Sequence, residues 1–300
     1  MGDPARGRRR GTSAKPLGRH RSADEAASFS ATFRALGELG YAGARVAAHI
    51  VDLDSGTVLS SIDDQVALPA AGLGKLLLLI DVSARMTARE SSGLGIVDKP
   101  AADAVLGPGL WQRLQVPALP VADLALLVAS VDDSLATNEL LRRVGLDAVR
   151  ERAESLGLSR TALLDIERDH RGPDDAPQLS VGSAAELAGL MRSLGRVAVV
   201  DEVSSRRVLD WLSRNADLSL VASAFGLDPL SHPDADHGIL LANKTGSAPG
   251  VRAEAGIVRG PRAAVAYAVL IEFDDSALGT RMAALEGMRA VGYDIVDYIH

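Results

Sequence analysis

The sequence contains no cysteine, few aromatic residues and no long apolar run, and each absence excludes a class of protein. Without cysteine the chain can form no disulfide, offers no thiolate to a metal and has no cysteine nucleophile. Phe, Trp and Tyr make up 3% of the 300 residues, so we expect a core built mainly from Leu, Val and Ala. No window approaches the roughly 18 uninterrupted apolar residues of a membrane-spanning helix, so no span is expected.

Charge is distributed unevenly along the chain. Residues 1–22 contain seven Arg or Lys and a single acid, Asp3, although the whole chain has a net charge of −7. A secretory signal carries an apolar segment after its basic residues, whereas the residues that follow this tail are acidic and small. We therefore expect a disordered basic tail over 1–22 and a cytoplasmic protein, with contact to nucleic acid or an anionic membrane as the alternative role of the tail. The acidic body argues against nucleic acid as the main partner.

The order of predicted strands and helices along the chain indicates a mixed α/β protein of the α+β class. Strands are predicted at 45–53, 57–62, 238–244, 253–258 and 263–273. Helices are predicted from Ser22 to Gly40 and at 76–86, 121–128, 135–144, 148–156, 184–194, 204–215 and 277–299. Because strands lie near both ends, we expect one antiparallel sheet flanked by the N- and C-terminal helices. This predicts an α/β domain from 23–70 and 205–300, with 71–204 as an inserted all-helical domain.

Three separated segments hold the residues most suited to chemistry. The first, residues 70–75, reads AAGLGK and opens a helix that is apolar on all sides. The second, residues 132–141, reads DDSLATNELL, and the third, residues 244–247, reads KTGS at the end of a predicted strand. In this order and with these flanks the segments resemble the class A β-lactamase and penicillin-binding-protein superfamily, whose signatures are S-x-x-K, S-D-N and K-T-G. The resemblance covers about residues 28–299.

This resemblance implies a serine-hydrolase fold and a set of roles for the matching residues. In the superfamily a serine attacks a carbonyl, and a lysine one helical turn later points into the same cleft. Lys75 would be that lysine, and Lys244 with Thr245 of the K-T-G triplet would bind a substrate carboxylate. The backbone N–H groups of Gly72 and of Ser247, which follows Gly246, would hold the developing oxyanion.

The first two motifs depart from the superfamily pattern. Gly72 occupies the place of the serine, so no acyl-enzyme can form there. Asp132 stands at the serine of S-D-N, and we expect it to form an ion pair that keeps Lys75 charged and poorly basic. Ser134 stands at the asparagine of that motif, and Ser130 is an alternative proton relay.

The segment that resembles the superfamily's Ω-loop is altered as well. The deacylating glutamate is expected three residues after Asp165, but Glu167 comes after two. Glu167 could serve as the catalytic carboxylate if the loop shifts by one residue. The sequence favours the alternative, in which Glu167 is a surface residue of a loop that continues through 168–173. An engineered change could produce Gly72 alone, but it would not produce Asp132 or the displaced Glu167.

No other residues suggest a second kind of site. Ser134, Thr245 and Ser247 are expected to line the cleft and to hydrogen-bond a ligand or the backbone. The histidines show no metal-ligand spacing, so neither a metal nor a cofactor is expected; two of them, His232 and His237, lie in a polar loop predicted to be at the surface, with ligand contact as the alternative.

Three functions remain open on the sequence. The first is a degenerate β-lactamase-like protein that binds a small carboxylate-bearing, acyl-amino or β-lactam-like ligand with weak or no hydrolysis. The second is an active hydrolase or acyltransferase that uses another nucleophile or a water activated by Lys75. The third is a non-catalytic interaction scaffold that recruits a partner through its basic tail.

Overall fold

The computed structural model describes residues 29–100, 105, 107–232 and 237–300. The predicted disordered tail over 1–22 and the predicted helix start at Ser22 lie outside these residues. No helix in the described part of the chain is long and apolar enough to cross a membrane.

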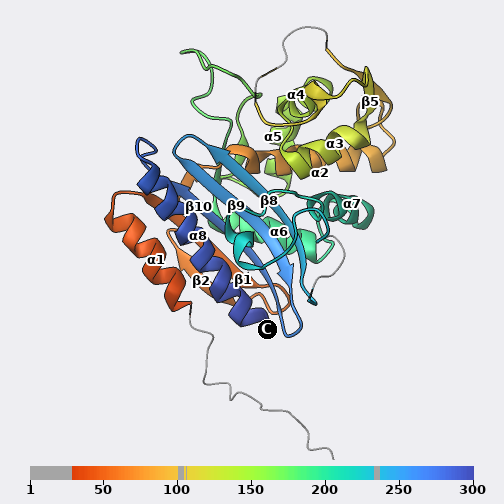
Figure 1. Cartoon of the computed structure of the whole chain (residues 1–300). Coiled ribbons are helices and arrows are strands. Elements are labelled where there is room, and N and C mark those ends of the chain that lie inside the picture. Colours follow the sequence, from red (N-terminus) through yellow and green to blue (C-terminus); the bar gives the residue numbers. More distant parts are fainter. Residues whose placement is uncertain (1–28, 101–104, 106, 233–236) are drawn as a thin grey trace, which may run out of the picture.

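The largest sheet has five antiparallel strands that come from both ends of the chain (Figure 1). Its order is β2-β1-β10-β9-β8. The strands are β1 (Arg45–Asp52), β2 (Val58–Ile62), β8 (Leu240–Ala248), β9 (Val251–Arg259) and β10 (Ala264–Glu272). The central strand β10 pairs with β1 on one side and with β9 on the other, which confirms the predicted assembly of one sheet from distant segments.

Helices cover both faces of this sheet. Helices α1 (Ser30–Tyr41) and α8 (Leu278–Ile299) pack together on one face, and α6 (Ala184–Gly195) lies against the other (Figure 1). Along β10, Val265, Tyr267 and Val269 belong to the core beneath α8, whereas the intervening alanines face the core that contains α6. Burial on both faces explains why this strand reads as a continuous apolar run rather than an alternating one.

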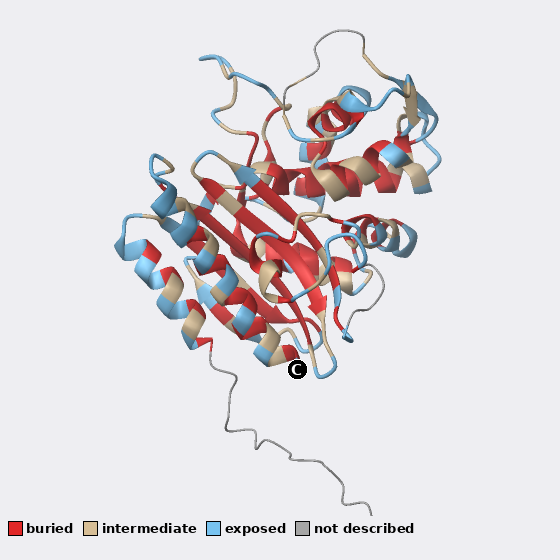
Figure 2. Ribbon diagram, in the orientation of Figure 1, coloured by how far each residue is buried: buried red, intermediate tan, exposed pale blue. Residues whose placement is uncertain are grey.

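The helical region is built around α2 (Lys75–Thr87), the apolar helix that the sequence places at the centre. All its residues from Lys75 to Ala84 are buried (Figure 2). The helices around it are α3 (Val121–Val131), α4 (Ser134–Val144), α5 (Leu146–Ser155) and α7 (Glu202–Leu212). The packing of four helices around one buried helix fixes the position of its first residue, Lys75.

Short elements complete the fold around these helices. The minor strands are β3 (Ala67–Pro69), β4 (Ile96–Asp98), β5 (Ala118–Pro120), β6 (Ala162–Leu163) and β7 (Ser180–Ser183). The 3₁₀ helices are η1 (Ala71–Gly74), η2 (Ser91–Gly93), η3 (Trp111–Arg113) and η4 (Val221–Ala224). Residues 71–204 thus include short strands and one helix, α6, that packs on the main sheet. The boundaries predicted for the two domains remain predictions.

Candidate functional site

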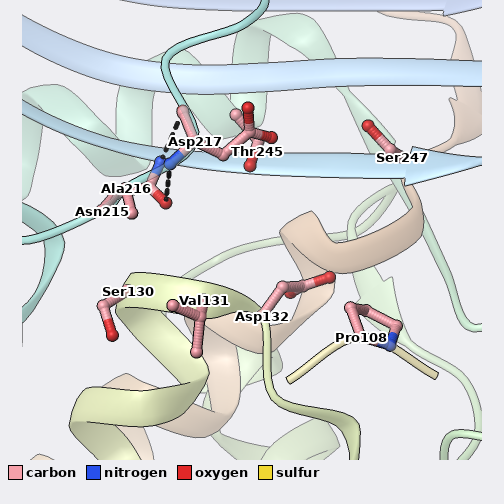
Figure 3. Close-up of a pocket in the computed structure, with 9 residues that line it drawn as sticks. All are labelled: Pro108, Ser130, Val131, Asp132, Asn215, Ala216, Asp217, Thr245 and Ser247. Carbon is pink, nitrogen blue, oxygen red and sulfur yellow. Dashed lines mark hydrogen bonds between the residues drawn. The ribbon is translucent and has the colours of Figure 1, made fainter. Parts of the chain in front are cut away.

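The three sequence segments meet at one cleft, between η1 with the start of α2, the junction of α3 and α4, and strand β8. Figure 3 shows Ser130, Val131 and Asp132 at the end of α3 on one side, with Thr245 and Ser247 on β8 across from them. A cavity of about 510 Å³ lies between these residues and the segment 215–217. A second cavity of about 430 Å³ is lined by Gly72, Glu167 and the turn after β8, and it shares Pro108, Asp132 and Ser247 with the first.

Lys75 is fully buried at the start of α2, and its ammonium group has two carboxylate partners. Nζ lies 2.6 Å from Oε1 of Glu167 and 3.0 Å from Oδ1 of Asp132. It also donates a hydrogen bond of 3.0 Å to the backbone carbonyl of Asp132. The predicted ion pair between Asp132 and Lys75 is confirmed.

Asp132 lies between the two lysines of the cleft. It ends α3 in the left-handed conformation, with φ 56° and ψ 34°, a region that Asp tolerates better than most residues with a side chain. Its Oδ1 accepts a hydrogen bond of 2.6 Å from Nζ of Lys244, in addition to the contact with Lys75. The backbone reversal at the end of α3 therefore directs one carboxylate onto both ammonium groups.

The two lysines respond differently to the same surroundings. Burial opposes the charged form of Lys75, but the attraction of Asp132 and Glu167 outweighs it and raises the pKa of Lys75 above its ordinary value. Burial lowers the pKa of Lys244, because the attraction of Asp132 does not offset it and the charge of Lys75 lowers that pKa further. Burial also acts against the ionised form of Asp132, yet the two lysines lower the pKa of that carboxyl. Lys75 is therefore held as a cation, as predicted, and is a poor base.

Gly72 lies directly beside the carboxylate of Asp132. A Cβ atom at this position would lie 2.7 Å from Oδ1 and 2.9 Å from Oδ2 of Asp132, and 3.0 Å from the carbonyl oxygen of Thr245. The preceding residue, Ala71, has a positive φ of 46°, a conformation that costs energy in a residue with a side chain. Its carbonyl oxygen accepts a hydrogen bond of 2.6 Å from the hydroxyl of Ser180, which helps to hold this turn.

Strand β8 closes the cleft with the K-T-G residues. Lys244 is fully buried, and its Nζ donates a second hydrogen bond, of 2.7 Å, to the carbonyl oxygen of Thr245. Gly246 packs tightly on η1, since a Cβ atom there would lie 2.5 Å from the carbonyl oxygen of Ala70. Thr245 and Ser247 line the first cavity, as predicted. Thr245 and Ser247 thus border the cavity, whereas Lys244 is buried and is not among the residues that line it.

Glu167 lies in the cleft, so the interpretation of this residue as a surface residue is wrong. Its side chain is 18% exposed and its carboxylate contacts Lys75. The backbone of Glu167 is held by Asn138 of α4, which donates to its carbonyl oxygen (2.9 Å) and accepts from its N–H (2.8 Å). The following arginines, Arg168 and Arg171, both bind Asp165. We call the two hydrogen bonds from Asn138 the Asn138 clamp; the sequence does not suggest it, because Asn138 is 29 residues from Glu167.

The Asn138 clamp gives a direct test of how this loop is held. Asn138→Ala is expected to lower the free energy of unfolding by about 1 to 2 kcal/mol, because two hydrogen bonds are lost. Asn138→Asp keeps the acceptor for the N–H of Glu167 but sets a second acceptor against its carbonyl oxygen, so it is expected to lose stability as well. Urea denaturation measures both changes, and an unchanged midpoint for Asn138→Ala would contradict the clamp.

Three other residues, in the second motif or just before it, have roles other than cleft chemistry. Ser134 is fully buried, its hydroxyl has no hydrogen-bond partner in the described structure, and it lines neither cavity, so its expected place in the cleft is wrong. Asp133 caps α4 and accepts hydrogen bonds from three backbone N–H groups, including that of Leu110. Ser130 lines the first cavity, but its hydroxyl donates to the carbonyl oxygen of Leu126.

The sequence did not indicate Asn215 and Asp217, which also line the first cavity. Asn215 donates to the side chain of Asn243, next to Lys244, and to the carbonyl oxygen of Asp217 (Figure 3). His232 is buried and is bonded to the carbonyl oxygen of Asp228, so its predicted place at the surface is wrong. Among the described residues no group of acidic, histidine or cysteine side chains could hold a metal ion.

Comparison with known proteins gives a consistent picture. A family model described as the β-lactamase enzyme family matches residues 28–299. The crystal structure of a β-lactamase from Sphaerobacter thermophilus DSM 20745 is similar, with a TM-score of 0.78 at 24% identity over 91% of this chain and 97% of that one. A β-lactamase from Xanthomonas campestris pv. campestris has a TM-score of 0.73 at 17% identity over 91% of this chain and 98% of that one.

A third similar structure is PBP-A, in a mutant form described as an acyl-enzyme complex with penicillin G. Its TM-score is 0.70 at 19% identity, over 89% of this chain and 95% of that one. At these identities the structures show a shared fold. No curated protein matches the chain.

Proposed function

Because the chain belongs to the β-lactamase enzyme family, we propose that it is a member in which Gly72 replaces the nucleophilic serine and that binds a small ligand in the cleft without acylation. Hydrolysis of β-lactams by this protein would then be weak or absent. The ligand class is a small carboxylate-bearing molecule of the acyl-amino or β-lactam-like kind.

The observation that carries this proposal is the position of the Asp132 carboxylate. It fills the space into which a side chain at position 72 would project, 2.7 Å from a Cβ atom there. The site therefore lacks a nucleophile at this turn and has no room for one while Asp132 keeps its position. The lysine that would activate a nucleophile is held as a cation by Asp132 and Glu167.

Other features support a retained binding cleft. The strained conformation of Ala71 is held by hydrogen bonding of its carbonyl oxygen, so the turn before Gly72 keeps a defined shape. Thr245 and Ser247 offer hydroxyl groups to a ligand carboxylate from β8, in a cavity of about 510 Å³, a size typical of small-molecule sites. Buried Lys244 would act on such a carboxylate through its charge rather than by direct contact.

Penicillin G provides the test. At about 100 times its dissociation constant a ligand stabilises the folded state by about 2.7 kcal/mol. For a chain of this size that is a rise in Tm of about 5 °C. The rise is expected without any increase in the mass of the intact protein, and it is expected to shrink in Thr245→Val, which removes one cavity hydroxyl. A covalent adduct on the unaltered protein would overturn the proposal.

The contact between Glu167 and Lys75 favours a second candidate, a hydrolase that activates water. The Glu167 carboxylate lies in the second cavity and is the better proton acceptor of the pair, since Lys75 is held charged. Turnover of nitrocefin that is lost in Glu167→Gln would support this candidate. Absence of turnover in the unaltered protein would exclude it for this substrate.

A further inference from the structure

The carboxylate of Asp132 contacts both lysines of the cleft, and it also lies where a side chain at position 72 would project. We propose that this carboxylate is a built-in occupant of the cleft, which takes the space of a side chain at position 72 and neutralises the two lysines. Gly72 and Asp132 would then be a matched pair, and Asp132 would determine which ligands the cleft admits. Only this last step, on ligands, rests on the proposed function.

The groups around the Asp132 carboxylate leave it little room to move. A Cβ atom at Gly72 would approach both carboxylate oxygens to less than 3.0 Å, a separation that requires one of the groups to move. The carboxylate has little freedom to do so, because Oδ1 is held at 2.6 Å by Lys244 and at 3.0 Å by Lys75. Both lysines are themselves fully buried, so neither can follow the carboxylate outward without losing its packing.

The Asp132 carboxylate also balances the charge of the cleft. Lys75, Lys244, Asp132 and Glu167 form a group of four side chains with a net charge of zero. An external carboxylate that approaches Lys244 must compete with Asp132, whose oxygen is already in hydrogen-bond contact with that ammonium. Removal of the Asp132 carboxylate would leave the group with a positive charge and an empty anion position between the lysines.

The backbone conformation at Asp132 allows substitutions that test the space and the charge of its carboxylate separately. Its left-handed conformation is adopted readily by Gly and is tolerated by Asn. Asp132→Gly therefore removes the carboxylate without straining the backbone. Asp132→Asn keeps a group of the same size in place and removes only its charge. The two variants separate the effect of occupied space from the effect of charge.

The experiment introduces Gly72→Ala into three proteins: the unaltered chain, Asp132→Asn and Asp132→Gly. Alanine is expected to lower Tm by about 2 to 5 °C in the first two, where the side chain at position 132 fills the space. In Asp132→Gly the loss of Tm is expected to be clearly smaller, because only the 3.0 Å contact with the carbonyl oxygen of Thr245 remains and a glycine in a helical conformation is replaced by alanine. An equal loss of Tm in all three backgrounds, or none in the unaltered chain, would overturn the matched pair.

Sodium acetate tests the charge part, with sodium chloride at equal ionic strength as the control. Acetate is expected to raise the Tm of Asp132→Gly, since it can replace the missing carboxylate between the lysines. It is expected to leave the unaltered chain and Asp132→Asn unchanged. If Asp132→Gly folds only with acetate present, that dependence supports the proposal; equal responses to acetate and chloride in Asp132→Gly would overturn it.

Neither measurement uses a β-lactam, so the outcomes are independent of the proposed function. A covalent penicillin adduct on the unaltered protein would overturn the proposed function and leave the Tm comparison intact. Conversely, a Tm loss that is the same in all backgrounds would remove the matched pair while non-covalent binding of penicillin G could still be observed.

Discussion

Lys75→Met is expected to lower the free energy of unfolding by about 3 to 5 kcal/mol, because it removes one partner from a buried set of ion pairs. The substitution deletes the contacts of Nζ with Glu167, with the Asp132 carboxylate and with the Asp132 carbonyl oxygen. Glu167 has some access to solvent and can relax, whereas Asp132 keeps only Lys244 as a cation. Chemical denaturation at pH 7 measures the loss.

The unfolding free energies of the unaltered protein and Lys75→Met, measured over a series of pH values, distinguish a loss of ion pairs from a loss of packing. The pKa of Lys75 is raised in the folded state, so its contribution is fully present below the ordinary value of 10.5 and is lost as pH rises through the folded pKa. The gap between the unaltered protein and Lys75→Met is therefore expected to narrow in strong alkali. Lys99→Met is the matched control, since within the part of the chain that the structure describes Lys99 bonds carbonyl oxygens at a partly exposed position, and its loss is expected to cost less than about 1 kcal/mol. A gap that is constant with pH would contradict the ion-pair explanation.

Glu254→Gln is expected to become more stable relative to the unaltered protein as pH rises from 4.5 to about 7. Glu254 is fully buried on β9, and its carboxyl group bonds the hydroxyl of Tyr267, the amide of Asn243 and the N–H of Ala222. Burial outweighs these hydrogen bonds and raises its pKa from 4.5 to about 7.

The sign of the effect follows from that shift. Between pH 4.5 and 7 the unfolded chain releases the proton of Glu254 while the folded chain retains it, so the folded state loses relative stability as pH rises. A shift of this size corresponds to about 3 kcal/mol. Glutamine does not titrate, so the difference in unfolding free energy between Glu254→Gln and the unaltered protein is expected to grow by about this amount across the interval.

Glu186→Gln serves as the control for this measurement. Burial acts against the charge of Glu186, but hydrogen bonds from Ser159, Thr161 and Arg160 lower its pKa, so its contribution is lost as pH falls. Its pH dependence therefore has the opposite sign. A flat difference profile for Glu254→Gln would show that the carboxyl titrates near its ordinary value in the folded protein.

Much of the fold could be predicted because the apolar patterns are strong. The predicted helix at 76–86 corresponds to α2 (Lys75–Thr87), and the predicted helix at 184–194 to α6 (Ala184–Gly195). The predicted strand at 238–244 ends too early, since β8 continues to Ala248. Its last residues are polar or small and show no apolar alternation, so their place in the sheet depends on pairing with β9.

The candidate site could be predicted only where family motifs label the residues. The motifs bring Lys75, Asp132 and Lys244 together, and the ion pair of Asp132 with Lys75 follows from that pattern. Glu167 was misplaced because its position depends on Asn138, a contact between distant segments. The overlap of the Asp132 carboxylate with the side-chain space of Gly72 depends on the left-handed backbone at Asp132, which no pattern in the sequence reveals.

Asp132 also has a consequence for the length of a ligand. The cavities of about 510 Å³ and 430 Å³ both include Asp132 in their walls, together with Pro108 and Ser247. The two cavities therefore share the side chain of Asp132 as a common wall. If the cleft binds ligands as proposed, a molecule confined to one cavity would leave the lysine contacts undisturbed, whereas one that spans both would have to pass the carboxylate that the two ion pairs hold. Affinity would then fall once a ligand is long enough to reach from one cavity into the other.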